Sequence, residues 1–346
     1  MNIVLLSGGS GKRLWPLSND IRSKQFIKIF KTEDGGYESM LQRVYRQIRQ
    51  ADPSAKVPVD PYVEDEYFKA VEELGRQAAK GEANLVLMGI HPTYPSENTV
   101  TISQGALWNG GVFACKLKYI LDMVHELIDF ENYAERNKIS FGYAVVENEK
   151  KIQVMKYKGQ WKDLGTWNTL TEAMEENSVG NAVIGNTCQN VHVINELNVP
   201  ILTMGVADMV ISASPEGILV SDKKQSSYIK PYVDDISQQV MFAEKSWGSF
   251  RVLDVENESM TIKVTLNPGC RMNYHSHRNR DEVWTVVSGE GRTSVDGMEQ
   301  KVTVGDVIAM EAGCRHTVIA DTKLKLIEVQ LGREISVDDK QKYPLE

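Results

Sequence analysis

The stretch NIVLLSGGSGKRLWPLS, residues 2–18, decides how the N-terminal region of the sequence is interpreted. Its apolar start, residues 2–6, predicts a short buried strand. The glycine-rich turn after that strand leaves bare backbone N–H groups that can be aimed at an anion, and two basic side chains add positive charge. A tight connection between a strand and a helix would use the same glycines, so the turn alone leaves both interpretations open. The candidate phosphate-binding residues are Gly8, Gly9, Gly11 and Lys12, with Arg13 as the second basic residue.

The residues that follow alternate between helix and strand signals. Apolar residues at helical spacing predict amphipathic helices over residues 41–48 and 68–74, the second closed by Gly81. Residues 57–60 are typical of the end of another strand, and the apolar run at 85–90 predicts a buried strand. Strands that alternate with helices favour an α/β domain built on a parallel sheet.

The pattern changes near residue 179. Residues 179–235 hold short apolar runs divided by Gly, Asn, Pro and Asp, which predicts a small β-rich connector. Residues 236–346 repeat β-strand patterns with glycine turns, which is typical of a closed antiparallel barrel or double-sheet roll. We therefore expect three domains, the first over residues 1–178. The predicted turns of the last domain contain Gly269, Gly289 and Gly297.

Composition and charge narrow the classes of protein. The chain has 346 residues, of which 42% are hydrophobic and 25% charged, as in a folded globular protein. A formal charge of −8 argues against a nucleic-acid partner, because nucleic-acid binders usually present a basic field. The sequence shows no apolar run long enough for a membrane helix or a signal peptide. We therefore expect no membrane partner and a cytoplasmic location.

Five motifs in a fixed order resemble the signature of sugar-1-phosphate nucleotidyltransferases, most closely of mannose-1-phosphate guanylyltransferases. Their shared order argues against a chance match, and the resemblance implies a Rossmann-like domain with a mostly parallel sheet. The motifs are LLSGGSGKRLWPLS with SKQF (residues 5–26), VPVD (57–60), GIHPTYP (89–95), WNGGVF (108–113) and WKDLGTW (161–167).

This resemblance implies transfer of GMP from GTP to mannose 1-phosphate, which gives GDP-mannose and pyrophosphate. The attacking sugar phosphate is already an anion, so the reaction needs cations and backbone donors more than a strong base. The family usually has Thr where this chain has Lys12, whose ammonium either binds phosphate or points to water. By resemblance, Asp60 and Asp163 would hold Mg²⁺, Lys24 a phosphate, Arg13 the leaving pyrophosphate, and Asn109 with Gly110 the sugar.

Three of the six histidines form a second pattern. His275 and His277 are two residues apart, so on a strand both side chains face the same side. Glu282 follows shortly after, and His316 lies near a second half-motif. The set resembles the ligands of the cupin fold, and its nitrogen and oxygen donors suit Zn²⁺ or a similar divalent transition metal. An empty cupin with buried imidazoles is the alternative.

A nucleotidyltransferase-like domain ahead of a cupin is the arrangement of the bifunctional mannose-1-phosphate guanylyltransferase/mannose-6-phosphate isomerase (type II) family. The resemblance implies that the cupin interconverts mannose 6-phosphate and fructose 6-phosphate, with Arg278 or Arg315 holding the phosphate. The spacing around Asn279 departs from the family, which leaves a dimerisation module as the other role for the cupin. For the whole chain, the alternatives are a sugar-nucleotide-binding protein without turnover and a nucleotidyltransferase for another sugar 1-phosphate. We expect a homo-oligomer, a dimer.

Parts of the family pattern have no counterpart in this sequence. The helix over residues 41–48 leads almost at once to VPVD at 57–60, where the family has two more strands. Residues 95–105 likewise connect two motifs that the family separates by a sugar-binding loop. Either the chain carries deletions, or the sequence joins segments that stand apart in a longer chain. We favour the second explanation because the flanking motifs keep their residues, and an intact mass well above 38.9 kDa would support it.

Overall fold

The described residues form two compact units, one within residues 38–163 and the other made of residues 11–37 together with 164–344. The predicted strands at 2–6 and 57–60, and with them Gly8, Gly9 and Asp60, lie outside the described residues. No helix in the described part of the chain is both long and apolar enough to cross a membrane. The computed structural model describes residues 11–19, 21–51, 65–90, 107–127, 141–159, 163–236, 239–333, 335 and 339–344.

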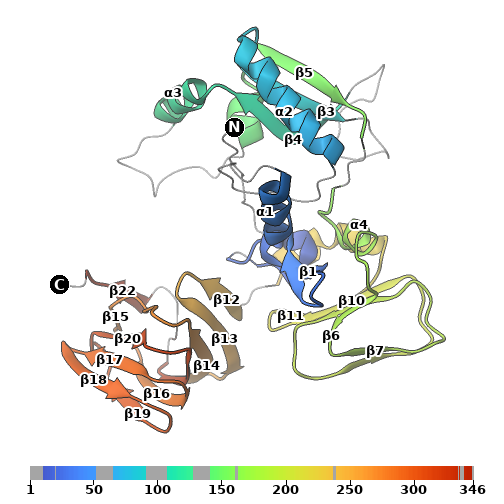
Figure 1. Ribbon diagram of the computed structural model, residues 1–346. Helices are drawn as coiled ribbons and strands as arrows, with labels where there is room; N and C mark the ends of the chain where they lie inside the picture. The colour runs from blue at the N-terminus through green and yellow to red at the C-terminus, as the bar shows by residue number, and fades with distance from the viewer. Residues whose placement is uncertain are drawn as a thin grey trace. The chain divides into compact units, whose positions relative to one another are not determined.

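The first unit is built on a three-stranded sheet in the order β4-β3-β5. The central strand, β3 (Leu85–Ile90), is buried along its whole length and confirms the strand predicted there. It pairs in parallel with β5 (Ile152–Tyr157) and antiparallel with β4 (Trp108–Cys115). Helix α2 (Asp65–Lys80) covers one face of the sheet (Figure 1), and its wholly buried Leu74 packs against the side chains of β3.

The helices of this unit begin and end where local signals place them. Helix α1 (Met40–Ala51) confirms the helix predicted over residues 41–48. It starts with a reciprocal cap: the Gln42 N–H donates to Ser39 Oγ at 3.2 Å, and the Ser39 N–H donates to Gln42 Oε1 at 2.9 Å. Helix α2 ends at Lys80 and is followed by Gly81, whose φ of 79° lies in the left-handed region that favours glycine. The other helical segments described here are α3 (Leu117–Leu127) and one π-helical turn at Gly142–Val146.

Six short strands between residues 178 and 222 confirm the predicted β-rich connector. β6, β8 and β10 pair in parallel in one sheet, and β7 pairs in parallel with β9 in another. Because each intervening strand carries the chain through the second sheet, the connector winds as a flattened coil (Figure 1). β11 closes the first sheet by antiparallel pairing with β10. The strands are β6 (Ser178–Gly180), β7 (Ala182–Ile184), β8 (His192–Asn195), β9 (Ile201–Thr203), β10 (Met209–Ser214) and β11 (Gly217–Asp222).

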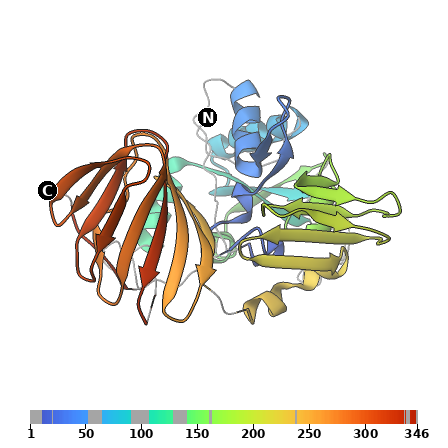
Figure 2. The ribbon, with the colours of Figure 1, turned by 90° about the horizontal axis from the view of Figure 1, so that it is seen from below.

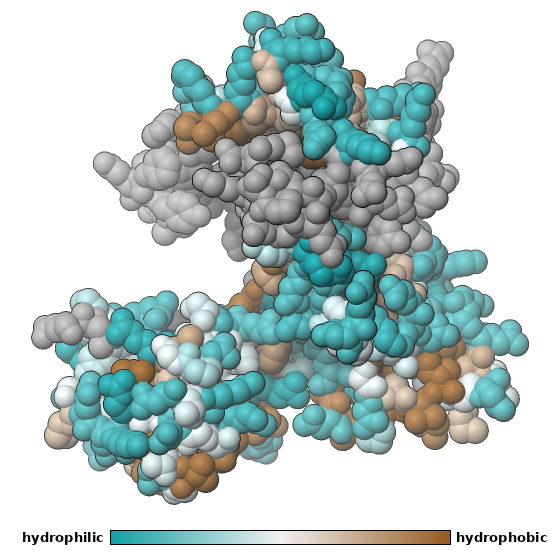
Figure 3. Space-filling view, in the orientation of Figure 1, coloured by the Kyte–Doolittle hydropathy of each residue, from teal (hydrophilic) through white to brown (hydrophobic). Residues whose placement is uncertain are grey.

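The connector keeps several apolar side chains in contact with solvent, and Figure 3 shows brown residues gathered over its strands. Val183, Leu202 and Met204 are all more than half exposed. Exposed apolar clusters of this kind often mark contact surfaces. Further helices and strands described in the structure are β1 (Lys28–Lys31), β2 (Tyr37–Ser39), α4 (Trp167–Thr171) and α5 (Lys230–Asp234).

A buried polar cluster holds the inside of the connector together. The ammonium of Lys223 lies 2.8 Å from His192 Nδ1 and close to the Asn190 side-chain oxygen, to which it donates at 2.5 Å. Burial, and then the charge of Lys223, lower the pKa of His192 from 6.5 to about 4. His192 is therefore neutral in the folded protein at pH values where the unfolded chain would protonate it.

We expect this histidine to make stability depend on pH. Its folded pKa is depressed, so its contribution is fully present above pH 6.5 and is lost as the pH falls toward about 4, because only the unfolded chain takes up the proton. Between pH 7.0 and 5.5, wild type should lose about 1 kcal/mol more than His192→Asn does. Urea unfolding of both proteins at pH 7.0 and 5.5 checks this, and parallel losses in the two would contradict it.

The C-terminal part of the chain is the predicted antiparallel double-sheet roll, and Figure 2 shows its two sheets facing each other. Wholly buried Trp284 lies among the apolar side chains packed between the sheets. The predicted turns are confirmed, because Gly269, Gly289 and Gly297 have φ values of 75°, 83° and 82°. One sheet has the order β12 (Phe242–Lys245), β13 (Gly248–Val255), β14 (Ser259–Leu266), β21 (Leu324–Leu331), β16 (Asp281–Ser288), β19 (Val307–Met310). The other has the order β18 (Met298–Val302), β17 (Gly291–Val295), β20 (His316–Ala320), β15 (His275–His277), β22 (Lys340–Lys342).

Candidate functional site

Three histidines meet inside the double-sheet roll. His275 and His277 stand on β15, and the register of β15 with β20 places His316 directly opposite His275. All three side chains are buried, and one ring nitrogen from each lies within 4.8 Å of the others. The intervening Ser276 bonds to the Tyr343 hydroxyl at 3.0 Å, away from the cluster, as strand alternation requires.

The backbone fixes how two of these rings are turned. His275 Nδ1 lies 2.6 Å from the carbonyl oxygen of Asn273, and His316 Nδ1 lies 3.0 Å from that of Cys314. When Nδ1 donates to a carbonyl, Nε2 is left as a lone-pair donor, which is how metal-ligating imidazoles are usually held. Among the described residues, buried His277 Nδ1 has no hydrogen-bond partner, and buried His316 Nε2 faces the Glu282 carboxylate, to which an unprotonated nitrogen cannot donate. Orphaned imidazole nitrogens of this kind fit a divalent metal ion.

Glu282 lies beside the three rings. Its Oε1 is 3.1 Å from His277 Nε2, and its Oε2 is 3.3 Å from His316 Nε2. Arg280 Nε donates to Oε1 at 3.1 Å, and Trp284 Nε1 donates to Oε2 at 3.2 Å. Burial by itself would raise the pKa of Glu282, but the close contacts of this carboxylate with His277 and His316 outweigh it and lower that pKa. The structure thus brings the four predicted ligands together, with the carboxylate in its ionised form.

Burial also prepares the histidines for ligation. It lowers the pKa of His275 to about 2 and, as the largest cause, also lowers the pKa of His277. Neutral imidazole is the form that binds a metal, so these rings need release no proton when an ion enters near neutral pH.

The sequence interpretation missed a second layer of polar groups in this site. Gln330 Nε2 donates to Glu282 Oε1 at 3.3 Å and also bonds to the carboxylate of Glu328. Burial, and then the charge of Glu282, raise the pKa of Glu328. The sequence does contain a signal that these two residues are buried. Glu328 and Gln330 continue the inward-facing alternation that Leu324 and Leu326 begin on β21.

The two arginines proposed for phosphate binding are placed differently from each other. Arg278 is exposed, and its backbone N–H donates to Asp339 Oδ1 at 2.9 Å. The guanidinium of Arg315 lies 4.2 Å from the centre of the Tyr343 ring. Arg280, which the sequence interpretation did not single out, is the buried one, and its Nη2 lies 3.1 Å from His277 Nε2.

Gly11, the one glycine of the predicted turn within the described residues, packs against the segment that carries Lys24. Gly11 has a φ of 58°, and a Cβ there would lie 3.2 Å from the backbone nitrogen of Lys24 and 3.1 Å from Ser18 Cβ. The Ser18 hydroxyl donates to the Gly11 carbonyl at 2.5 Å. Glycine at position 11 therefore permits both the left-handed backbone conformation and the close approach of Ser18 and Lys24. The structure brings Gly11 and Lys24 together.

The remaining predicted residues of the transferase site are dispersed among the described segments. Lys12 forms an ion pair of 2.6 Å with Asp234 of α5, an interaction that the sequence did not predict. Arg13 is exposed at the start of the loop. Asn109 is exposed on β4, where its side chain accepts from the Gly111 N–H at 2.9 Å. The last two are Gly110, which is buried on β4, and Asp163, which is half-buried.

Comparison with known proteins gives each half of the chain a counterpart. Residues 2–97 match the family model for nucleotidyl transferase, and residues 262–330 match the model for a cupin domain. XanB, a xanthan biosynthesis protein of Xanthomonas campestris, is 23% identical over 97% of this chain and 96% of its own length. A Vibrio cholerae protein named putative mannose-1-phosphate guanylyltransferase is 22% identical over 97% of this chain and 98% of its own length. These two domain matches, together with the relatives over nearly the full chain, fit the bifunctional mannose-1-phosphate guanylyltransferase family.

The alignment with these relatives also bears on the expected gaps. The alignment to XanB runs over 459 positions, whereas this chain has 346 residues. More than a hundred alignment positions therefore have no counterpart in this sequence, although the match extends over nearly all of both chains. The resemblance is thus interrupted by absent segments, as the motif spacing predicted.

Proposed function

We propose that this protein transfers GMP from GTP to mannose 1-phosphate and releases pyrophosphate. The observation that carries the proposal is the loop in which Gly11 packs against the backbone of Lys24. The contact brings one glycine of the turn next to the residue that carries a cation, which supports an anion-binding role. Relatives that match nearly the whole chain carry the guanylyltransferase name.

The chemistry follows from the charges involved. An oxygen of the sugar phosphate bonds to the α-phosphorus of GTP, and the bond from that phosphorus to the oxygen of the departing pyrophosphate breaks. Arg13 and Lys24 reduce repulsion between the anions, and Gly8, Gly9, Gly11 and Lys12 complete the phosphate contacts. Asp60 and Asp163 would hold Mg²⁺, which neutralises charge on the triphosphate when bound. Asn109 and Gly110 would contact the mannose.

We propose that the cupin holds one divalent transition metal, Zn²⁺ or a similar ion, through His275, His277, His316 and Glu282. When bound, such an ion polarises hydroxyl and carbonyl oxygens of a ligand. The substrate proposed for this site is an open-chain mannose 6-phosphate, interconverted with fructose 6-phosphate. Arg280 fixes the Glu282 carboxylate, and Gln330 links it to Glu328.

The first experiment measures pyrophosphate release from GTP and mannose 1-phosphate with Mg²⁺. UTP, ATP and glucose 1-phosphate serve as alternative substrates. Turnover selective for GTP and mannose 1-phosphate supports the proposal, and turnover with another pair indicates a different nucleotidyltransferase. Binding of GTP without turnover would instead identify a sugar-nucleotide-binding protein.

We also propose a cytoplasmic homodimer. The exposed apolar side chains of the connector support self-association, because exposed apolar patches are often buried in an interface between protein chains. Light scattering after size-exclusion chromatography measures the mass of the assembly directly.

A further inference from the structure

Two carbonyl groups of the loop between Gly11 and Lys24 are bound, one by α4 and the other by the connector. The carbonyl of Trp15 accepts from Trp167 Nε1 at 3.0 Å, and the carbonyl of Pro16 accepts from Ser214 Oγ at 2.6 Å. The Trp15 ring lies against Gly217, where a Cβ would come within 2.6 Å of it. The Trp15 ring of the loop is therefore packed closely against the connector at Gly217.

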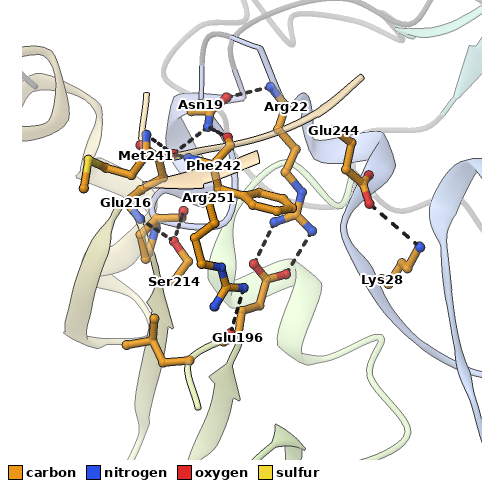
Figure 4. A network of polar contacts seen from close by, with 12 residues as sticks. Asn19, Arg22, Lys28, Glu196, Ser214, Glu216, Met241, Phe242, Glu244 and Arg251 are labelled. Atoms are coloured by element: carbon orange, nitrogen blue, oxygen red, sulfur yellow. Dashed lines mark hydrogen bonds and ion pairs between the residues drawn. The ribbon is translucent and has the colours of Figure 1, made fainter. Parts of the chain in front are cut away.

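A single buried carboxylate joins the loop to the first strand of the cupin. Glu216 Oε1 accepts from Asn19 Nδ2 at 2.8 Å and from the backbone N–H groups of Met241 and Phe242, both at 2.9 Å. Asn19 Nδ2 also donates to the Phe242 carbonyl at 2.9 Å. Figure 4 shows these groups converging from three parts of the chain that are distant in sequence.

Arg22 makes the second connection. Its guanidinium donates two bonds to the Glu196 carboxylate, at 2.7 and 2.9 Å, and lies 5.3 Å from the centre of the Phe242 ring. Arg251 lies 5.7 Å from the same ring and donates to the Glu196 carbonyl at 3.4 Å. Only 8% of Arg22 is exposed, so its planar, two-point contact is protected from competing water.

The turn at Asn19 and Arg22 leads directly to Lys24. Asn19 Oδ1 accepts from the Arg22 N–H at 2.6 Å, and the Asn19 N–H donates to the Arg22 carbonyl at 3.0 Å. A short helical turn, Lys24–Phe26, follows at once. Only Ser23 lies between Arg22 and Lys24, so a shift of Arg22 is passed on to Lys24 along a short stretch of backbone.

We infer that β12, the first strand of the cupin, positions the transferase loop, with Arg22 as the positioning residue that acts through Lys24. The cupin thus has a role in the transferase reaction that is separate from any chemistry at its own histidines. This inference rests on the proposed function of Lys24 as a phosphate ligand. It assigns Arg22 no contact with substrate.

The test is a double-mutant cycle on the full chain. Arg22→Lys keeps the charge but loses the planar contact with Glu196, and it should lower kcat/KM for GTP about tenfold. In a Lys24→Ala background the same change should cost less than about twofold, because the residue through which Arg22 acts is gone. Phe242→Leu, a change made only in the cupin, should lower kcat/KM in the same direction. Arg292→Lys, at an exposed ion pair with Asp321, is the matched control and should leave kcat/KM unchanged.

Equal losses in both backgrounds would show a merely structural role and would overturn the inference, as would no loss at all. If the wild type releases no pyrophosphate, the proposed function fails, and hydrogen exchange of residues 15–26 then tests the positioning by itself. Exchange at least about tenfold faster in Arg22→Lys and Phe242→Leu than in Arg292→Lys would support it. Exchange equal to that of the control would refute it.

Discussion

Replacing Asp163 by asparagine is expected to lower kcat/KM for pyrophosphate release from GTP and mannose 1-phosphate by roughly 10³-fold. The amide has nearly the shape of the carboxylate but lacks the charge that a hard divalent cation requires. The fold should be unaffected, because Asp163 is half-buried and belongs to no helix or strand. Steady-state assays over a range of Mg²⁺ concentrations measure both the loss and any shift in Mg²⁺ dependence.

The matched control is Asp122→Asn. Asp122 lies on α3, exposed, in an ion pair with Lys118 four residues away, and losing such a pair has little effect. We expect it to retain wild-type turnover. Activity of Asp163→Asn within threefold of wild type would contradict the assignment and would leave Mg²⁺ binding to other carboxylates.

The second large effect is expected at the cupin. His316→Ala should weaken binding of a divalent transition metal by more than about 100-fold, because it removes one of the converging ligand atoms outright. Purified wild-type protein, loaded with Zn²⁺ or Mn²⁺ and dialysed, should carry about one ion per chain, and the variant close to none. Elemental analysis of the dialysed protein gives the stoichiometry, and a competition titration gives the affinity.

His192→Asn is the control for this experiment, because it removes a buried histidine that is not one of the proposed metal ligands. His192 is a buried histidine of the connector, bonded to Lys223 and outside the cluster of three. Its replacement should leave the metal content unchanged while altering stability. Full metal content in His316→Ala would mean that the cupin ion, if one binds, does not depend on this imidazole.

Local patterns predicted the parts of the fold that depend on neighbours in sequence. The spacing of apolar residues over 41–48 and the stop at Gly81 define helices whose hydrogen bonds are internal. The i, i+2 spacing of His275 and His277 likewise determines a shared side of a strand, whatever surrounds it. These predictions held because the physics that fixes them acts within a few residues.

Other features depend on partners that sequence distance conceals. Lys12 was predicted to bind phosphate, and the structure pairs it with Asp234, which lies 222 positions further along the chain. Its role toward phosphate stays a prediction. Glu328 and Gln330 showed the alternation of a buried strand, but their polar type hid it, because polar residues are buried only where partners satisfy them. Such partners become visible only once the strands are paired.

The fastening of the loop has a consequence for the order of events during protein synthesis. A ribosome completes residues 11–26 early, but Glu196, Glu216 and Phe242 lie 174, 197 and 223 positions after the loop residues they bind. The loop must wait for more than half of the chain to emerge before it can settle, and contacts of such long sequence separation form slowly. A fragment that stops before residue 242 would contain the transferase motifs in full yet leave the loop without its fastening to β12. Cutting this protein between the connector and the cupin would therefore separate segments that must fold together.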